Sequence, residues 1–237
     1  MRREILLNLT KLRWYLTGLY WAGLEDWPAK TGFSNESPTL GGSTEEAAPD
    51  ASVASEQMLA SAQQELGNCA RCRLHTTRST IVFGEGSPTA RVVFVGEGPG
   101  YDEDKQGRPF VGKAGKLLDK MIRALGYARN EVYICNMVKC RPPKNRTPNS
   151  EEIEACSPFL TKQIDAIRPR VICALGACAA QSLLQSTRPI SQLRGKVHHW
   201  RGLPFVATFH PAYLLRNPSQ KPAAWQDLLQ IRRLANN

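Results

Sequence analysis

The 237-residue sequence predicts an α/β fold, a three-layer sandwich with a central, mostly parallel, four-stranded sheet and helices on both faces. The first observation is that apolar runs typical of buried strands alternate with segments of helical periodicity. The second is that three of these runs end at polar segments, which begin with Glu97, Asn136 and His210. Because the carboxyl ends of parallel strands lie at one edge of a sheet, we expect a site there.

The expected strands and helices lie between residues 56 and 234. The strands are expected over 91–97, 131–136, 170–176 and 204–210. The helices are expected over 56–66, 113–125, 150–167, 177–184 and 223–234. Ser150 is the expected N-cap of the helix over 150–167, because Glu151 and Glu152 follow it in the first turn.

The preceding residues divide into two parts. Residues 4–24 place leucines three and four positions apart, which predicts an amphipathic helix. Such a helix docks on the main domain or contacts a partner protein or a membrane surface. Residues 34–56 are rich in Ser, Pro, Gly, Ala and acidic side chains and predict a flexible linker. We therefore expect a helical extension over 1–33, a linker over 34–56 and one domain over 57–237.

The charge of the chain is unevenly distributed. The net charge is +10, although residues 1–60 carry five basic and eight acidic side chains. The basic excess of the later residues favours a polyanionic partner such as nucleic acid, and a merely basic soluble protein is the alternative. No uncharged run approaches the roughly 18 residues of a membrane span, and no secretory signal is recognisable. These features predict a cytoplasmic protein with no membrane partner, whose seven cysteines are thiols or metal ligands.

Segment 96–115 predicts a ligand site, because its six glycines allow the backbone to approach a ligand closely. The segment matches neither common phosphate-binding glycine pattern, although a nucleotide site remains an alternative. Phe110 is either a core residue or a ring that stacks on a base. Four acidic residues lie in the same segment, and a solvated acidic loop is the alternative to a catalytic carboxylate: Glu97, Asp102, Glu103 and Asp104.

The cysteines predict a metal site of undecided type. Cys69 and Cys72 form a C-x-x-C pair, and Cys140 and Cys156 stand further along the chain. Four thiolates bind either zinc or an iron–sulfur cluster, and the pattern alone does not choose between them. The other three cysteines fall within expected strands or helices and are expected in the core: Cys135, Cys173 and Cys178.

Segment 208–218 combines a histidine with an apolar pair. His210 precedes a proline, so an extended backbone is expected at a strand end, where a neutral imidazole can donate to a developing anion. A structural histidine is the alternative. Leu214 and Leu215 beside Arg216 suit a wedge that fills the gap left by a flipped base. The alternative is that both leucines belong to the core.

Together these blocks resemble the family 4 uracil-DNA glycosylases over about residues 58–235: GEGPG, EDKQGRPFVGKAGKLL, NMVKCRPPKNRTP, the C-x-x-C pair and FHPAYLLRNP. The resemblance implies that Asn136 reads the uracil edge, Phe110 stacks on the base and His210 stabilises the departing anion, with Gly98 beside them in the uracil site. It implies a structural 4Fe–4S cluster bound by four cysteines: Cys69, Cys72, Cys140 and Cys156.

The resemblance also implies roles for acids and for DNA contacts. Glu97 and Glu103 match the active-site acids. Glu103 is the expected water-positioning group, because Gly98 stands where the best-known glycosylases of the superfamily carry Asp. The HPAYLLR loop matches the DNA-inserting segment. The expected DNA contacts are basic residues near the site and residues of that loop: Lys139, Arg141, Lys144, Arg146, Leu214, Leu215 and Arg216.

The expected function is therefore hydrolysis of the N-glycosidic bond of uracil flipped out of single- or double-stranded DNA. We expect a monomer and leave open a protein partner for the N-terminal helix. One alternative is a glycosylase of broader range that also removes hypoxanthine or xanthine. A second is a covalent binder of uracil-DNA, disfavoured because KNRTPNSEE, the stretch directly after the RPP segment, contains no histidine. A third is a non-catalytic DNA-binding module held by zinc.

Overall fold

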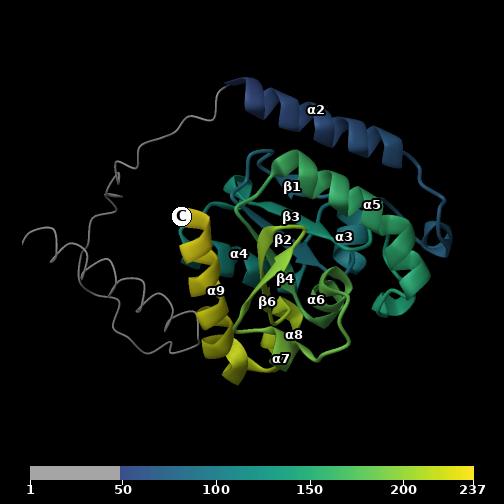
Figure 1. Ribbon diagram of the computed structural model, residues 1–237. Coiled ribbons are helices and arrows are strands. Elements are labelled where there is room, and N and C mark those ends of the chain that lie inside the picture. The colour runs from purple at the N-terminus through teal and green to yellow at the C-terminus, as the bar shows by residue number, and fades with distance from the viewer. Residues whose placement is uncertain (1–48) are drawn as a thin grey trace, which may run out of the picture.

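The structure is a computed structural model in which residues 49–237 are described. The expected extension over 1–33 and the first part of the expected linker lie outside the described residues. The fold is α/β, with a six-stranded sheet between layers of helices (Figure 1). No helix within residues 49–237 combines the length and the apolar character that crossing a membrane requires.

Four parallel strands form the centre of the sheet and confirm the expected ones. They are β2 (Val92–Gly96), β3 (Tyr133–Asn136), β4 (Val171–Leu175) and β6 (Leu203–Thr208), which lie side by side in the order β3-β2-β4-β6. Their side chains are almost all buried, as expected for strands covered on both faces. Gly96 is in register with Asn136, and Leu175 with Thr208, so these strands end at one edge.

The expected count of four strands is wrong, because an antiparallel strand is added at each edge. β1 (Glu85–Gly86) pairs with β3, and β5 (Val197–Trp200) pairs with β6. β1 is only two residues long and therefore has no recognisable pattern. In β5, exposed and half-buried side chains alternate, as in an edge strand that faces solvent, so it lacks the apolar run of the central strands.

The five expected helices are present in the expected order, and three short α-helices occur between them. Three match their expected bounds, namely α4 (Lys113–Leu125), α5 (Ser150–Ile167) and α6 (Ala177–Leu184). The last helix, α9, spans Lys221–Asn236. The remaining helices were not expected as separate elements: α3 (Tyr101–Gln106), α7 (Ile190–Leu193) and α8 (Pro211–Arg216).

One expected helix start and one expected N-cap residue are wrong. Helix α2 spans Pro49–Leu66, so the last residues of the expected linker are helical. Proline at the first helical position and the following alanines and glutamate favour this earlier start. The N-cap of α5 is Asn149, not Ser150. Asn149 Oδ1 accepts from the Glu152 amide at 2.9 Å, and the Glu152 carboxylate accepts from the Asn149 amide at 2.9 Å, a capping box.

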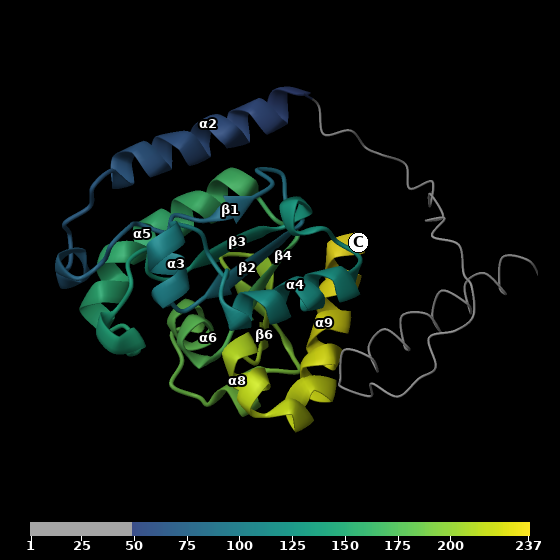
Figure 2. The ribbon, with the colours of Figure 1, turned by 180° about the vertical axis from the view of Figure 1, so that it is seen from behind.

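Alternating strand residues point to the two faces of the sheet, as the two-residue period of a strand requires. On one face, Phe94 and Ile134 pack with side chains of α4 and α9. On the other face, Val95 and Cys135 pack with side chains of α5 and α6. Seen from behind, α4 and α9 cover the near face, while α2 lies along α5 as an outer layer (Figure 2). Both faces are thus closed, and the open edge lies at the carboxyl ends of the strands.

Candidate active site

A pocket of about 530 Å³ opens at the carboxyl ends of the central strands. It brings together six residues that the sequence assigns to a uracil site or to catalysis: Glu97, Gly98, Glu103, Phe110, Asn136 and His210. Arg216 also lines it, from α8. The three strand-end residues therefore meet at one site, as the parallel topology predicts.

Asn136 is the last residue of β3 and is only 1% exposed. Its backbone carbonyl accepts a hydrogen bond from Lys139 Nζ at 2.8 Å. Its side-chain Oδ1 is buried and has no hydrogen-bond partner among residues 49–237. A buried acceptor without a partner is costly, so its presence beside a pocket indicates that a bound ligand supplies the donor.

The Phe110 ring lies next to this amide in a constrained backbone. Phe110 has φ of 51°, in the left-handed region, and is 6% exposed. A side chain on Gly115 would overlap the Phe110 carbonyl oxygen, so the glycine is required by this close approach. Such backbone strain in an aromatic residue is typical of functional sites. The ring centre lies 5.6 Å from that of His210, the two rings are tilted by 32°, and both residues line the pocket.

Replacing Gly96 with alanine tests whether this space receives a ligand. A Cβ at Gly96 would lie 2.5 Å from Phe110 Cζ and would also contact Asn136 Oδ1. We expect Gly96→Ala to lower the rate of the reaction by at least about 100-fold, since small misplacements of binding groups have such effects. The measurement is a single-turnover rate with a folding check by circular dichroism. Gly202→Ala is the control, because a Cβ there meets nothing within 4 Å and Gly202 lies outside the pocket; since its φ of 84° is strained for alanine, it reports the effect of backbone strain alone. Equal rates in both variants would contradict the assignment.

The two acids of the loop have different surroundings. Glu103 Oε1 accepts from the amides of Val111 and Gly112 at 2.9 and 3.0 Å, and Oε2 accepts from the Gly100 amide at 3.1 Å. Glu103 thus joins both arms of the loop. Burial raises the pKa of Glu97, and a hydrogen bond with Thr147 opposes the rise. The water-positioning role expected of Glu103 stays a prediction, and its observed contacts order the loop backbone.

Of the other two acids of the segment, Asp102 lines the pocket and Asp104 does not. Asp104 is 1% exposed, and its Oδ1 accepts from the amides of Ser79 and Thr80 at 2.8 and 3.3 Å. Asp102 lines the pocket, and its carboxylate lies beside Gly112. Asp104 is therefore a structural anchor for the segment before β1.

His210 is the N-cap of α8, and its ring is held in one tautomer. Nδ1 accepts from the Ala212 amide at 3.1 Å, so Nε2 carries the proton of the neutral imidazole. The pKa of His210 is lowered to about 4, mainly by burial and also by the nearby Arg216, while Glu103 opposes the shift. At neutral pH, His210 is therefore an uncharged hydrogen-bond donor through Nε2.

The pH dependence of stability tests this environment. As pH falls from 6.5 towards 4, a histidine in the unfolded chain takes up a proton before buried His210 does. The free energy of unfolding of the wild type should therefore decrease over this window relative to that of His210→Gln. Above pH 7, His210 is neutral in both states, and the difference should be constant. Urea unfolding at a series of pH values measures it. If the free energies of unfolding of the two proteins differ by a constant amount throughout the window, His210 is not kept neutral by its surroundings.

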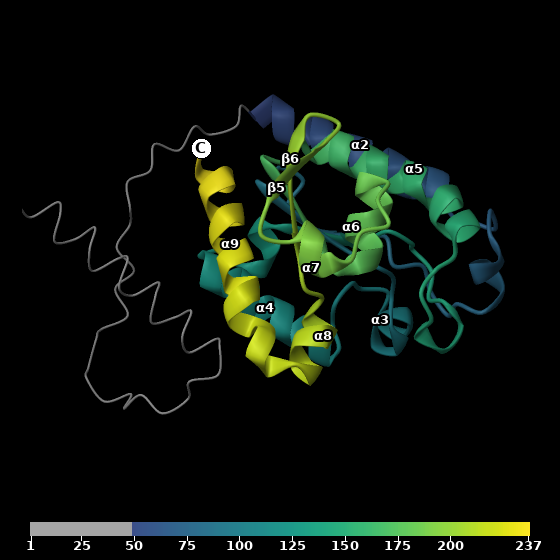
Figure 3. The same cartoon turned by 60° about the horizontal axis from the view of Figure 1, so that its bottom comes forward.

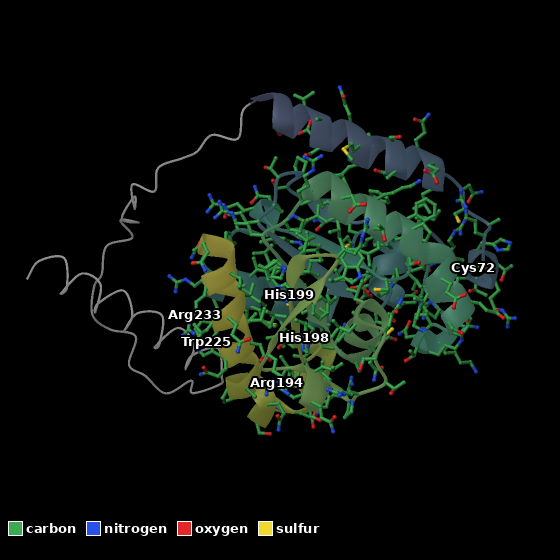
Figure 4. The ribbon with its side chains drawn as sticks, in the orientation of Figure 1. Cys72, Arg194, His198, His199, Trp225 and Arg233 are labelled. Atoms are coloured by element: carbon green, nitrogen blue, oxygen red, sulfur yellow. The ribbon has the colours of Figure 1, made fainter. Side chains whose placement is uncertain are left out.

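A buried network holds the end of β6, two residues before His210. Asp227 of α9 is fully buried and accepts from Thr208 Oγ1 at 2.8 Å. Arg194 donates to both Asp227 oxygens at 2.9 and 3.0 Å. Arg194 also lies over the Phe209 ring, 5.1 Å from its centre. Figure 4 shows Arg194 beside α9, the helix that carries Trp225, and well away from Cys72. The network fixes the backbone that positions His210.

Two of the expected DNA contacts are wrong. Lys139 is fully buried, and its Nζ donates to the Asn136 carbonyl and to Gln163 Oε1 at 2.6 Å, so it faces inward and cannot meet DNA. Leu214 is also fully buried, because the short helix α8 turns it into the core against α4 and α9. Leu215, the next residue, is 45% exposed. Leu214 is therefore a core residue, which is the alternative stated above, and only Leu215 is exposed.

The remaining expected DNA contacts lie around the pocket. Arg146 lines it and forms a two-pronged ion pair with the buried Glu152 at 2.6 and 2.8 Å. Lys144 is exposed in the turn over Pro143–Asn145. Arg141 Nε donates to Asn145 Oδ1 at 2.7 Å. The pocket also contains residues that the sequence did not single out, namely Tyr101 and Tyr213; both are aromatic residues on the same short segments as the expected site residues.

The four expected metal ligands come from three segments that converge. Cys140 and Cys156 are buried and pack with Leu74 and Val138, with Cys72 against them. Cys69 lies near enough to Cys156 to act on its pKa. Burial raises the pKa of Cys140 to about 11, so a thiolate there needs a stabilising cation. Within residues 49–237, no three such side chains surround the position of a single metal ion.

Hydrogen-bond donors already point at these sulfur atoms. Arg78 Nη1 donates to Cys140 Sγ at 3.2 Å, and the Lys139 amide donates to Cys156 Sγ at 3.3 Å. Arg71 Nη1 lies 3.5 Å from Cys69 Sγ. Donors aimed at sulfur are typical of thiolates that ligate an anionic cluster. The other cysteines differ, since Cys135 and Cys173 are core residues as expected and Cys178 is half-buried, not fully buried as expected.

The pocket defines a class of protein, one that presents a buried asparagine amide, an aromatic ring and a neutral histidine at the carboxyl edge of a parallel sheet. The family model described as the Uracil DNA glycosylase superfamily matches residues 83–229. The chain is 49% identical to the Type-4 uracil-DNA glycosylase of Thermotoga maritima over 168 residues, 70% of this chain and 88% of that relative.

Two further relatives give similar matches. The Type-4 uracil-DNA glycosylase of Sulfurisphaera tokodaii is 44% identical over 73% of this chain and 83% of its own length. That of Archaeoglobus fulgidus is 43% identical over 71% of this chain and 88% of its own length. The chain therefore belongs to the type-4 uracil-DNA glycosylases of this superfamily.

Proposed function

We propose that this chain excises uracil from DNA by hydrolysing its N-glycosidic bond and leaves an abasic site. The observation that carries the proposal is the buried, unpartnered Asn136 Oδ1 beside the Phe110 ring. Uracil offers an imide N–H donor next to a carbonyl acceptor on one edge. Asn136 can accept from the N–H and donate to the carbonyl, so both buried groups gain partners.

The remaining residues support the bond cleavage. Uracil must leave the stacked duplex to reach the pocket, and Phe110 can stack on its face. When the C–N bond breaks, the bonding electrons go to the uracil ring. The Nε2–H of neutral His210 can donate to the carbonyl oxygen on which negative charge develops. Water then attacks the sugar carbon C1′, and its proton passes to a base.

We propose Glu97 as that base, with Glu103 as the residue that orders the loop. Burial raises the pKa of Glu97, which strengthens it as a proton acceptor. The carboxylate of Glu103 is already engaged by three backbone amides. Glu97→Gln should therefore lower the turnover number more than substrate binding.

We infer that Cys69, Cys72, Cys140 and Cys156 hold a 4Fe–4S cluster. Their four sulfur donors and the hydrogen bonds aimed at them support this choice. When bound, the cluster supplies a structural cross-link and no chemical step. It would tie the segment after α2 to the loop after β3 and to α5. A brown protein with broad absorbance in the blue supports the cluster, whereas a colourless zinc protein would contradict it.

Several finer expectations stay predictions. They are activity on both single- and double-stranded DNA, the monomeric state and a cytoplasmic location. A protein partner for the N-terminal helix also stays a prediction, since that helix lies outside the described residues. The basic residues around the pocket support a DNA substrate, because cations near the phosphates contribute most of the affinity for the backbone.

The test uses end-labelled oligonucleotides that carry one uracil opposite guanine, opposite adenine or unpaired. Matched strands carry thymine or hypoxanthine, and alkali breaks the strand at abasic sites. Cleavage at uracil alone supports the proposal. Equal cleavage at hypoxanthine would favour a glycosylase of broader range. A stable protein–DNA band without cleavage would favour the covalent binder and contradict turnover.

A further inference from the structure

Tyr101 is a large aromatic residue exposed at the mouth of the pocket. It is the first residue of α3 and lines the pocket, yet it is 56% exposed. That is the largest exposed fraction among the exposed large hydrophobic side chains of residues 52–237. The uracil-reading Asn136, by contrast, is 1% exposed. Tyr101 is therefore a residue of the rim, and the base-reading groups lie below it.

Two cations lie against the Tyr101 ring. The guanidinium carbon of Arg141 is 5.1 Å from the ring centre, and Lys105 Nζ is 5.9 Å from it. Arg141 is itself held, since its Nε donates to Asn145 Oδ1 at 2.7 Å. A guanidinium fixed at a second point restrains the ring, which reduces the entropy that the ring would lose on stacking against a ligand. The rim thus presents a pre-oriented aromatic face in a positively charged setting.

The position of Tyr101 relates it to the nucleotides beside the flipped one. Helices α3 and α8 both line the pocket, with Tyr101 from α3 and Arg216 from α8. Figure 3 shows both helices at the same end of the molecule. A base that reaches Asn136 leaves its sugar and phosphates at the mouth. The neighbouring nucleotides, which lose a stacking partner when the base leaves, then lie along the rim.

We propose that Tyr101, held by Arg141, is a stacking subsite for an unpaired nucleobase adjacent to the flipped uracil. This inference rests on the proposed function and adds a second point of contact with DNA. An exposed aromatic ring flanked by cations is the recurring arrangement for binding single-stranded nucleic acid. Because every base has an aromatic face, the subsite would tolerate any sequence and would respond only to whether a base is present.

The experiment is a cycle of changes in the protein and in the DNA. Single-stranded oligonucleotides carry one uracil, and each of the two neighbours on either side is replaced in turn by an abasic spacer. The kcat/KM for excision is measured with wild type, Tyr101→Ala and Tyr101→Phe. Met58→Ala is the matched control, because Met58 is 43% exposed and lies on α2, away from the pocket.

We expect one spacer position to lower kcat/KM of the wild type by about 10-fold, within the range for a lost base–aromatic stack. Tyr101→Ala should show the same loss with the complete strand and no further loss with that spacer. Tyr101→Phe keeps the ring and should keep the sensitivity to the spacer. Met58→Ala should behave as wild type with every strand.

Other outcomes overturn the subsite in distinguishable ways. If the losses from Tyr101→Ala and from every spacer multiply, the ring does not stack on a neighbouring base. If no spacer changes the wild-type rate while uracil is still excised, the subsite is wrong and the proposed function stands. If wild type excises no uracil from any strand, the proposed function itself fails.

Discussion

Replacing Asn136 with alanine should lower the rate of uracil excision about 1,000-fold or more. The substitution removes both the acceptor for the imide N–H and the donor to the adjacent carbonyl, and it leaves the uracil edge unpaired in a buried pocket. Sites built to hydrogen-bond a substrate lose about 10⁴-fold or more when a partner group is missing, and single donors to a developing anion contribute about 10²–10³-fold. Single-turnover excision from a uracil oligonucleotide measures the effect.

Asn130→Ala is the matched control for this variant. Asn130 is an exposed asparagine in the turn over Arg129–Glu131, which precedes β3, so it lies beyond the opposite end of that strand from Asn136. DNA that already carries an abasic site should bind to Asn136→Ala with only slightly reduced affinity, since contacts with the backbone remain. Excision by Asn136→Ala at the rate of Asn130→Ala would show that Asn136 does not read uracil.

The fold was predictable where one element carries a strong pattern by itself. Strands β2, β3, β4 and β6 are apolar runs buried on both faces, and α4 has apolar residues along one side. A parallel sheet places the carboxyl ends of its strands at one edge, so the sequence alone predicts that Asn136 and His210 lie close together. What escaped prediction depends on long-range pairing. Two-residue β1 exists only because β3 offers a free edge, and β5 only because it folds back on β6.

The site was predictable in its residues but not in the direction of some side chains. Lys139 stands among basic residues of a segment expected to contact DNA, and lysine is rarely buried. Only the fold shows that its ammonium group meets the Asn136 carbonyl and Gln163. Leu214 and Leu215 are chemically alike in the sequence, and the rotation of α8 alone decides that one is core and the other exposed. Tyr101 was missed because only the folded structure shows that Arg141 and Lys105 lie against its ring.

The inward Lys139 joins the proposed cluster to the uracil site. Its amide donates to Cys156 Sγ and its Nζ donates to the Asn136 carbonyl, while the next residue, Cys140, accepts from Arg78. Arg141, which follows, lies over Tyr101 at the rim. A change at the cysteines therefore has a short covalent path to both the base-reading amide and the proposed stacking subsite.

Cys140→Ser should consequently lose iron and lower the stability of the whole domain. A cross-link between distant segments, for which a disulfide is the measured example, contributes about 2–5 kcal/mol. For a chain of this size, the loss corresponds to a decrease in Tm of roughly 4–20 °C. Iron analysis, absorbance in the blue and thermal unfolding measure the three consequences. Excision should fall as well, because Arg141 and the strand end of β3 lose their anchor.

Cys178→Ser is the matched control, since Cys178 is half-buried at the start of α6 and belongs to none of the three converging segments. It should retain the iron content and the absorbance of the wild type. Unchanged iron in Cys140→Ser would remove Cys140 from the ligand set. Loss of iron with unchanged Tm and excision would show that the cluster does not support the site, and the path through Lys139 would then carry no coupling.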